Sequence, residues 1–214
     1  MLNVIVVAML LAAQGSAVPY RNEPTRLRNV GAIIMPDDYP VEALRRHEYG
    51  ISSIVMLVSA EGQVTACDVT ESSGSETLDR TTCALHKKRA RFDPARDAAG
   101  VPVAGEYRLA TSWGVDDHQP QTTIESFLQV PAIPADYHSP VRARLLFDEA
   151  GHVTACEVTD SSGSVAADRA ACAYTKQQLV ITAPRKTSNG VPLVAVRYLT
   201  ANLLEQGAAP PAKR

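Results

Sequence analysis

Two nearly identical stretches hold the residue types that could carry out chemistry. VTACDVTESSGS covers residues 64–75 and VTACEVTDSSGS covers residues 153–164, and each combines a cysteine, carboxylates and a Ser-Ser-Gly-Ser run. These residue types suit three chemistries: thiol redox exchange, metal binding and nucleophilic catalysis by serine. The repeat therefore raises the question of whether the chain needs a catalytic centre, a metal site or a scaffold twice.

The spacing of these residues fits none of the three chemistries. The chain has no C-x-x-C motif and no Gly-x-Ser-x-Gly motif, which redox thiols and hydrolase serines commonly use. His47-Glu48 begins an HExxH pattern, but Ile51 stands where the second histidine is needed. We expect a non-enzymatic protein with no catalytic residue, no metal ligand and no cofactor, in which Ser72-Ser73-Gly74-Ser75 forms a turn and a helix N-cap.

The four cysteines are expected to form two structural disulfides. Fifteen residues lie between Cys67 and Cys83, and fifteen also lie between Cys156 and Cys172. Four cysteines allow three pairings, and equal spacing within each copy favours these two pairs. Closing a loop of this size is worth roughly 3 kcal/mol per disulfide in the chain-entropy model.

The N-terminus predicts export. Residues 2–13 form an apolar run too short to span a bilayer, and Gly15-Ser16-Ala17 offers small residues for signal peptidase. We expect a signal peptide over residues 1–17, and therefore an oxidising compartment in which cysteines pair. No Lys or Arg precedes the apolar run, so an uncleaved anchor or a buried element remain the alternatives.

Composition argues against a polyanionic partner. The formal net charge of the 214-residue chain is -2, so there is no basic excess for binding nucleic acid. The hydrophobic content of 45% is that of a folded globular protein.

Two tandem α+β units are predicted from the hydrophobic pattern. In the first copy, residues 51–58 and 63–70 form a hairpin, a helix follows over residues 76–90, and a third strand covers residues 103–113. The second copy repeats this order with strands at 141–147 and 152–159, a helix after Ser164 and a strand at 193–203. Each unit is expected to be a two-layer β-β-α-β arrangement, in which a three-stranded antiparallel sheet carries a helix on one face. PVEALRRHEYG adds an N-terminal helix to the first unit only.

The expected boundaries follow from this repeat. They are a signal peptide over 1–17, an N-terminal segment over 18–34, domain 1 over 35–114, a linker over 115–131, domain 2 over 132–204 and a disordered tail over 205–214. Asp79-Arg80 and Asp168-Arg169 recur near the two helix starts. We expect each carboxylate, in the first turn of its helix, to have a nearby basic partner.

An ordered set of short motifs resembles the C-terminal domain of the TonB energy-transducer family. The set covers residues 39–113. It includes Tyr39-Pro40, Ala43-Leu44-Arg45-Arg46, Gly50, Gly62-Gln63-Val64, Val69, Ser72-Ser73-Gly74, Leu78-Asp79, Arg89-Ala90-Arg91-Phe92-Asp93-Pro94-Ala95, Gly100 and Pro102-Val103. The second copy keeps the middle of the pattern and departs at both ends, as a degenerate copy would. The cysteine pair of each copy resembles that of a disulfide-bearing variant of the domain.

The resemblance implies a periplasmic binding module that recognises a protein or peptide strand. Members of the family bind the short N-terminal box of outer-membrane transporters, which adds a strand to the edge of the domain's third strand. We expect such a module without its own membrane anchor. The candidate partner-binding residues are Tyr39, Pro40, Val103, Gly105, Tyr107, Leu109 and Thr111 in the first copy and Leu193, Ala195, Arg197 and Leu199 in the second.

Two other functions remain open from the sequence. The two third strands could pair with each other and join both copies into one continuous sheet, which would make a structural envelope protein without a free edge. A thiol oxidoreductase or hydrolase is the third possibility.

Overall fold

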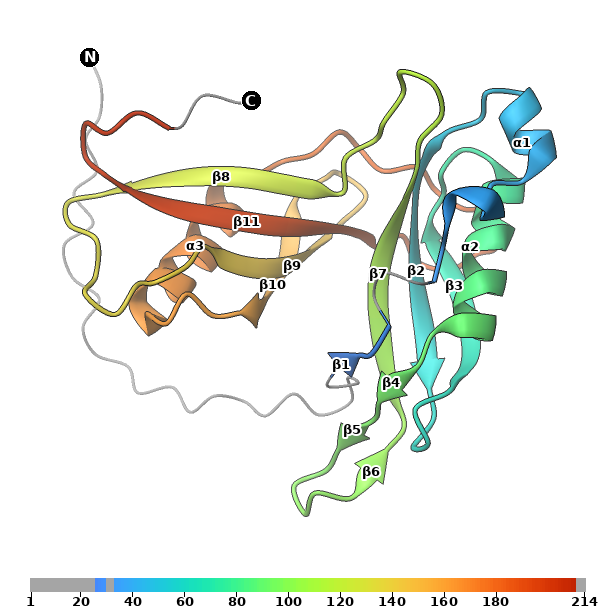
Figure 1. Cartoon of the computed structure of the whole chain (residues 1–214), viewed down its shortest axis with the longest axis horizontal. Helices are drawn as coiled ribbons and strands as arrows, with labels where there is room; N and C mark the ends of the chain where they lie inside the picture. The colour runs from blue at the N-terminus through green and yellow to red at the C-terminus, as the bar shows by residue number, and fades with distance from the viewer. Residues whose placement is uncertain (1–25, 30–32, 211–214) are drawn as a thin grey trace.

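The computed structural model describes residues 26–29 and 33–210 of the chain. The signal peptide predicted over residues 1–17 and the end of the predicted tail, residues 211–214, lie outside the described residues. Figure 1 shows two main sheets, each with a long helix, and the second sheet meets the first at one end. We call the first sheet with its helix unit 1 and the second sheet with its helix unit 2.

Unit 1 is a three-stranded antiparallel sheet in the order β3-β2-β7, with α2 on one face (Figure 1). The elements of this layer pair are β2 (Gly50–Val58), β3 (Val64–Glu71), α2 (Glu76–Arg89) and β7 (Gly105–Trp113). Before the sheet come β1 (Arg26–Leu27), the short 3-10 helix η2 (Pro36–Asp38) and α1 (Val41–Arg45). Two small antiparallel pairs are formed by β1 with β4 (Phe92–Asp93) and by β5 (Ala95–Arg96) with β6 (Pro102–Val103).

Local sequence explains the layers of unit 1. Ile54, Met56 and Val58 alternate along β2 and are buried in the core between the sheet and α2. The Ser75 hydroxyl accepts a hydrogen bond from the Leu78 backbone N–H, so Ser75 caps α2 as predicted.

Unit 2 repeats the same order of elements. They are β9 (Val141–Phe147), β10 (Val153–Asp160), α3 (Val165–Gln178) and β11 (Ala195–Glu205). Leu145 and Phe147 of β9 are fully buried in one cluster with Ala171 of α3. As expected, no helix lies between Tyr137 and β9 in this described part of the chain.

The linker prediction is wrong over its second half. β8 (Thr123–Val130) pairs in parallel with β11 over its whole length, so unit 2 is a four-stranded sheet in the order β10-β9-β11-β8. The predicted three-stranded antiparallel sheet therefore holds for unit 1 but not for unit 2. The physical reason is burial, because Ile124, Leu128 and Val130 of β8 pack on the core of unit 2.

The two third strands do not pair with each other. β7 pairs with β2, and β11 pairs with β9 and β8, so the alternative of one continuous sheet is wrong. The start of β11 instead contacts the face of the first sheet opposite α2, where the Val196 backbone N–H donates to Ser53 Oγ at 2.9 Å. Arg197 forms a two-bond ion pair with Glu71, and both side chains are almost fully buried. The two units are thus joined by a buried polar contact.

Candidate functional site

β7 forms an outer edge of unit 1. Its sheet partner among the described residues is β2 alone. Alternate residues of an edge strand direct their backbone N–H and C=O groups away from the neighbouring strand. In β7 these residues include Arg108, Ala110 and Ser112, since the Arg108 C=O and the Ala110 N–H bond to atoms outside the sheet. This is the edge that strand addition would use.

A hollow of about 380 Å³ lies beside this edge, on the side that carries α2. It is lined by Tyr107, Leu109, Ala110, Thr111 and Ser112 of β7, by Leu27, Ile33 and Ile34 of the N-terminal segment, by His86 of α2 and by Tyr198 of β11. Burial lowers the pKa of His86, and its Nδ1 lies 2.7 Å from the Thr82 carbonyl oxygen. The imidazole is therefore neutral at neutral pH, and the rest of the lining combines apolar side chains with the hydroxyl-bearing Thr111, Ser112 and Tyr198.

The structure places four of the five candidates from the first third strand in β7. Gly105 and Leu109 are buried, Tyr107 and Thr111 are half-buried, and the Tyr107 ring packs against Phe92 with ring centroids 5.0 Å apart. Val103 lies in β6 and pairs with Ala95, so it does not belong to the edge. Tyr107, Leu109 and Thr111 line the hollow together with Ala110 and Ser112, and the last two also provide outward backbone groups.

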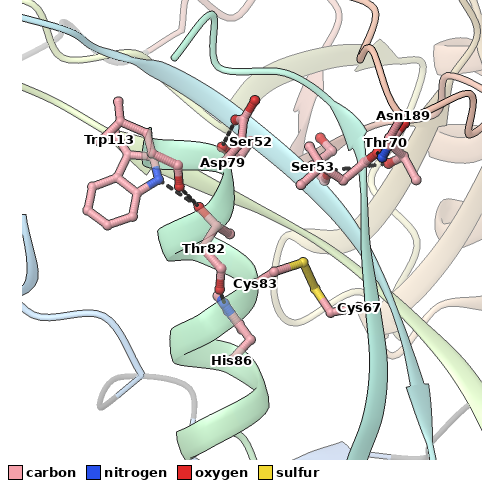
Figure 2. Close-up of a disulfide and its surroundings, with 12 residues drawn as sticks. Ser52, Ser53, Cys67, Thr70, Asp79, Thr82, Cys83, His86, Trp113 and Asn189 are labelled. Atoms are coloured by element: carbon pink, nitrogen blue, oxygen red, sulfur yellow. Dashed lines mark hydrogen bonds between the residues drawn. A yellow bond between two sulfur atoms is a disulfide. The ribbon is translucent and has the colours of Figure 1, made fainter. Parts of the chain in front are cut away.

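Tyr39 and Pro40 lie at the far end of β7. The Tyr39 ring meets the Trp113 ring edge-on with centroids 5.3 Å apart, and its hydroxyl donates to the Glu48 carbonyl oxygen. Burial and the Glu48 carboxylate raise the pKa of Tyr39. Pro40 is the N-cap residue of α1. The structure therefore brings these two residues to the C-terminal end of β7, which the Trp113 indole N–H ties to Thr82 Oγ1 of α2 at 2.8 Å (Figure 2).

The prediction of a second open edge, in unit 2, is wrong. β8 covers the outer side of β11 along the register from Tyr198 to Glu205. Ala195 and Leu199 are buried, Arg197 is paired with Glu71, and Leu193 precedes the strand. Ala195 and Leu199 thus serve the core, and Arg197 serves the contact with unit 1.

Two residues of unit 2 that sequence reasoning missed contact the β7 edge. The Tyr198 hydroxyl accepts a hydrogen bond from the Ala110 backbone N–H at 3.2 Å, and Arg144 Nη1 donates to the Arg108 carbonyl oxygen at 2.8 Å. Arg144 is 3% exposed, and its guanidinium lies 4.5 Å from the centre of the Tyr107 ring. A charged residue in the middle of the buried run VRARLLF was the signal available in the sequence, because arginine is rarely buried without a partner.

The repeated Ser-Ser-Gly-Ser run bonds to a carboxylate in each copy. Asp79 accepts hydrogen bonds from the hydroxyls of Ser52, Ser72 and Ser73 at 2.6 to 2.8 Å and from the Ser73 N–H at 2.9 Å; Figure 2 shows the Ser52 contact. The predicted basic partner of Asp79 is wrong, since Arg80 lies exposed beside Glu76. The hydroxyls donate to a carboxylate, and the cluster fastens the turn to the first turn of α2.

The second copy has the same arrangement. Asp168 accepts hydrogen bonds from Ser161 Oγ at 2.6 Å and from Ser162 Oγ at 2.7 Å. Burial raises the pKa of Asp168, but the hydrogen bonds from Ser161 and Ser162 outweigh burial and leave the pKa below its ordinary value. The bonds from the two neighbouring serines to an aspartate are thus duplicated, which accounts for the near-identity of the two stretches.

Each disulfide joins the second strand of its unit to the helix. Cys67 pairs with Cys83 and Cys156 pairs with Cys172, with Cα atoms 5.7 and 5.6 Å apart. Figure 2 shows the first of these bonds between β3 and α2. Within residues 26–29 and 33–210, no group of three or more His, Cys, Asp or Glu side chains could hold a metal ion.

Unit 1 is a small α+β domain with an edge strand beside an apolar hollow. Residues 35–115 match the family model described as Gram-negative bacterial TonB protein C-terminal. For this part of the chain, the match confirms the resemblance to the TonB family that was predicted for residues 39–113. It does not extend to unit 2, so a degenerate second copy remains a prediction. No curated protein matches the chain.

Proposed function

We propose that the protein is an envelope binding module that recognises a partner protein by adding a partner strand to the edge of β7. The observation that carries this proposal is the outward edge of β7 beside its hollow, inside the segment that matches the TonB C-terminal model. Strand addition gains affinity from backbone hydrogen bonds and selectivity from pockets for alternate side chains. Unit 1 offers both features, whereas β8 covers the corresponding edge of unit 2.

The proposal includes export to the periplasm, a non-enzymatic role and an outer-membrane transporter segment as the partner. Two disulfides suit an oxidising compartment. In the described part of the chain, no helix is long and apolar enough to cross a bilayer. The serines of the repeated motif bond to Asp79 and Asp168 in the following helices, which supports a structural role for them.

A proline at Ser112 tests the proposal. The Ser112 N–H belongs to the outward set, so Ser112→Pro removes a donor from the edge and leaves the hydrogen bonds to β2 in place. Ser112→Ala is the matched control, because both variants lose the hydrogen bond from the Ser112 hydroxyl to the Pro120 carbonyl oxygen. The probes are synthetic peptides from the N-terminal segments of outer-membrane transporters, with affinities measured by calorimetry.

We expect the wild type and Ser112→Ala to bind within about twofold of each other and Ser112→Pro to bind about fivefold more weakly, as loss of one hydrogen bond implies. Circular dichroism establishes that both variants are folded. Equal affinity of Ser112→Pro and Ser112→Ala would exclude the β7 edge. Absence of binding by every peptide would exclude transporter segments as the partner.

A further inference from the structure

Two side chains of unit 2 form hydrogen bonds with backbone groups on the outward edge of β7. Tyr198 accepts from the Ala110 N–H at 3.2 Å, and Arg144 donates to the Arg108 carbonyl oxygen at 2.8 Å. One contact supplies an acceptor and the other a donor. These are the two kinds of group that the backbone of an added strand would supply to the same edge.

The chain contains its own example of a filled edge. Gly105 of β7 pairs with Val58, the last residue of β2, and Ala195 of β11 pairs with Phe147, the last residue of β9. Gly105 and Ala195 are therefore equivalent positions in the two third strands. Three residues further on, Arg108 is equivalent to Tyr198, and five residues further on, Ala110 is equivalent to Thr200. In unit 2 these positions face β8, and the Tyr198 N–H donates to the Thr122 carbonyl oxygen at 2.8 Å.

β8 also shows which kind of strand suits such an edge. It is parallel to β11, and Ile124, Leu128 and Val130 lie at even-numbered positions and pack on the core beside β11. The corresponding space in unit 1 is the hollow lined by Tyr107, Leu109 and Thr111. A strand with apolar residues at alternate positions therefore fits both places.

We propose that unit 2 competes with the partner strand for the edge of β7, through the Tyr198 hydroxyl and the Arg144 guanidinium. The inference rests on the proposed function and adds its regulation and the pattern of the partner strand. A parallel strand has to displace these two groups before it can bond to Arg108 and Ala110.

The two contacts differ in how firmly they are held. Arg144 also bonds to Glu157, with Nε to Oε2 at 3.0 Å, and lies over the Tyr107 ring. The Tyr198 contact is a single hydrogen bond between neutral groups, since burial raises the pKa of Tyr198 above its ordinary value. The hydrogen bond between Tyr198 and Ala110 therefore depends on one oxygen atom. Tyr198→Phe removes that atom and keeps the ring.

The test compares the full-length wild type with Tyr198→Phe. Tyr137→Phe is the matched control, because the Tyr137 hydroxyl likewise accepts from a strand N–H, that of Leu203 at 3.1 Å, away from β7. One measurement is amide hydrogen exchange at Ala110 without ligand. The other is the affinity for a synthetic peptide TTIESFLQV, the sequence of residues 122–130.

We expect Tyr198→Phe to accelerate exchange at Ala110 and to strengthen peptide binding about fivefold, the effect of one competing hydrogen bond. Tyr137→Phe should change neither quantity. The competition is overturned if amide exchange at Ala110 is unchanged, if peptide affinity rises by less than about twofold, or if it rises equally in Tyr137→Phe. Each of these results leaves the strand-binding site itself in place. A peptide that binds none of the three proteins overturns the inference together with that site.

Discussion

Removing one charge of the buried pair between the units should strongly destabilise the protein. Arg197 Nη1 and Nη2 lie 2.8 and 2.7 Å from the two carboxylate oxygens of Glu71, and the side chains are 10% and 5% exposed. The Ser53 hydroxyl donates to the same carboxylate at 2.5 Å. Glu71 therefore meets two donors from two different units in a place that water hardly reaches.

The magnitude follows from the geometry. Glu71→Leu leaves the guanidinium buried without its partner, and Arg197→Met leaves the carboxylate in the same position. Breaking a buried pair from one side costs about 3–5 kcal/mol, whereas replacing both charges by apolar groups is often nearly neutral. In the double variant Ser53 still loses its acceptor, which costs about 1 kcal/mol. The double variant should therefore be more stable than either single variant.

Urea unfolding followed by circular dichroism measures these differences as a double-mutant cycle. We expect each single variant to lose a large share of its free energy of unfolding, which is about 5–15 kcal/mol for a typical folded domain. The double variant should regain most of that loss. A loss below about 1 kcal/mol in both single variants would show that water solvates the pair. Additive losses in the double variant would equally refute the reasoning, because independent sites add and partners do not.

Three further predictions concern the disulfide, the buried histidine and β8. The pair Cys67→Ser with Cys83→Ser should lower the free energy of unfolding by about 3 kcal/mol in a denaturant titration; an unchanged stability with loss of a catalytic turnover would instead favour the thiol enzyme. Because burial lowers the pKa of His86 below 6.5, the unfolded chain takes up the proton first, and stability should fall as the pH falls below about 6.5; His86→Gln should reduce this slope between pH 7 and 5, and an equal slope in both proteins would contradict the expectation. Ser126→Pro removes a β8 donor that faces β11 and should be about 1–3 kcal/mol less stable than Glu125→Pro, whose N–H faces away; equal thermal stability of the two variants would show that the β8 pairing contributes little.

The elements that could be predicted are those with local signals. Alternating apolar residues and a serine cap were sufficient for β2, β3 and α2, and the repeat supplied the same elements in unit 2. β8 was missed because Thr123–Val130 follows a segment without strand character and its partner, β11, lies far along the chain. A parallel pairing with a distant strand leaves no turn signal between the two strands.

The open edge of the candidate site could be predicted, but not the contacts that close it. The resemblance to a known family indicated the third strand, and the structure places Tyr107, Leu109 and Thr111 there. Nothing in the spacing of Arg144 and Tyr198 shows that they reach the other unit, because this contact depends on how two folded units meet. The position of Arg144 within a mostly apolar strand was a local sign that such a contact exists, and the structure confirms that its side chain is buried.

The divergence between the two copies bears more on the proposed function than their near-identity does. The identical stretches build the same disulfide and the same serine-carboxylate cluster, as Asp79 and Asp168 show. The third strands differ instead at the positions that decide what lies at their edges. β8 of the same chain fills the edge of β11, while single atoms of Tyr198 and Arg144 hold the edge of β7. An edge held by two side chains is protected against indiscriminate strand pairing. Under the proposed function, a specific strand reaches this edge at a far lower cost than by displacing β8, which pairs with β11 through eight residues.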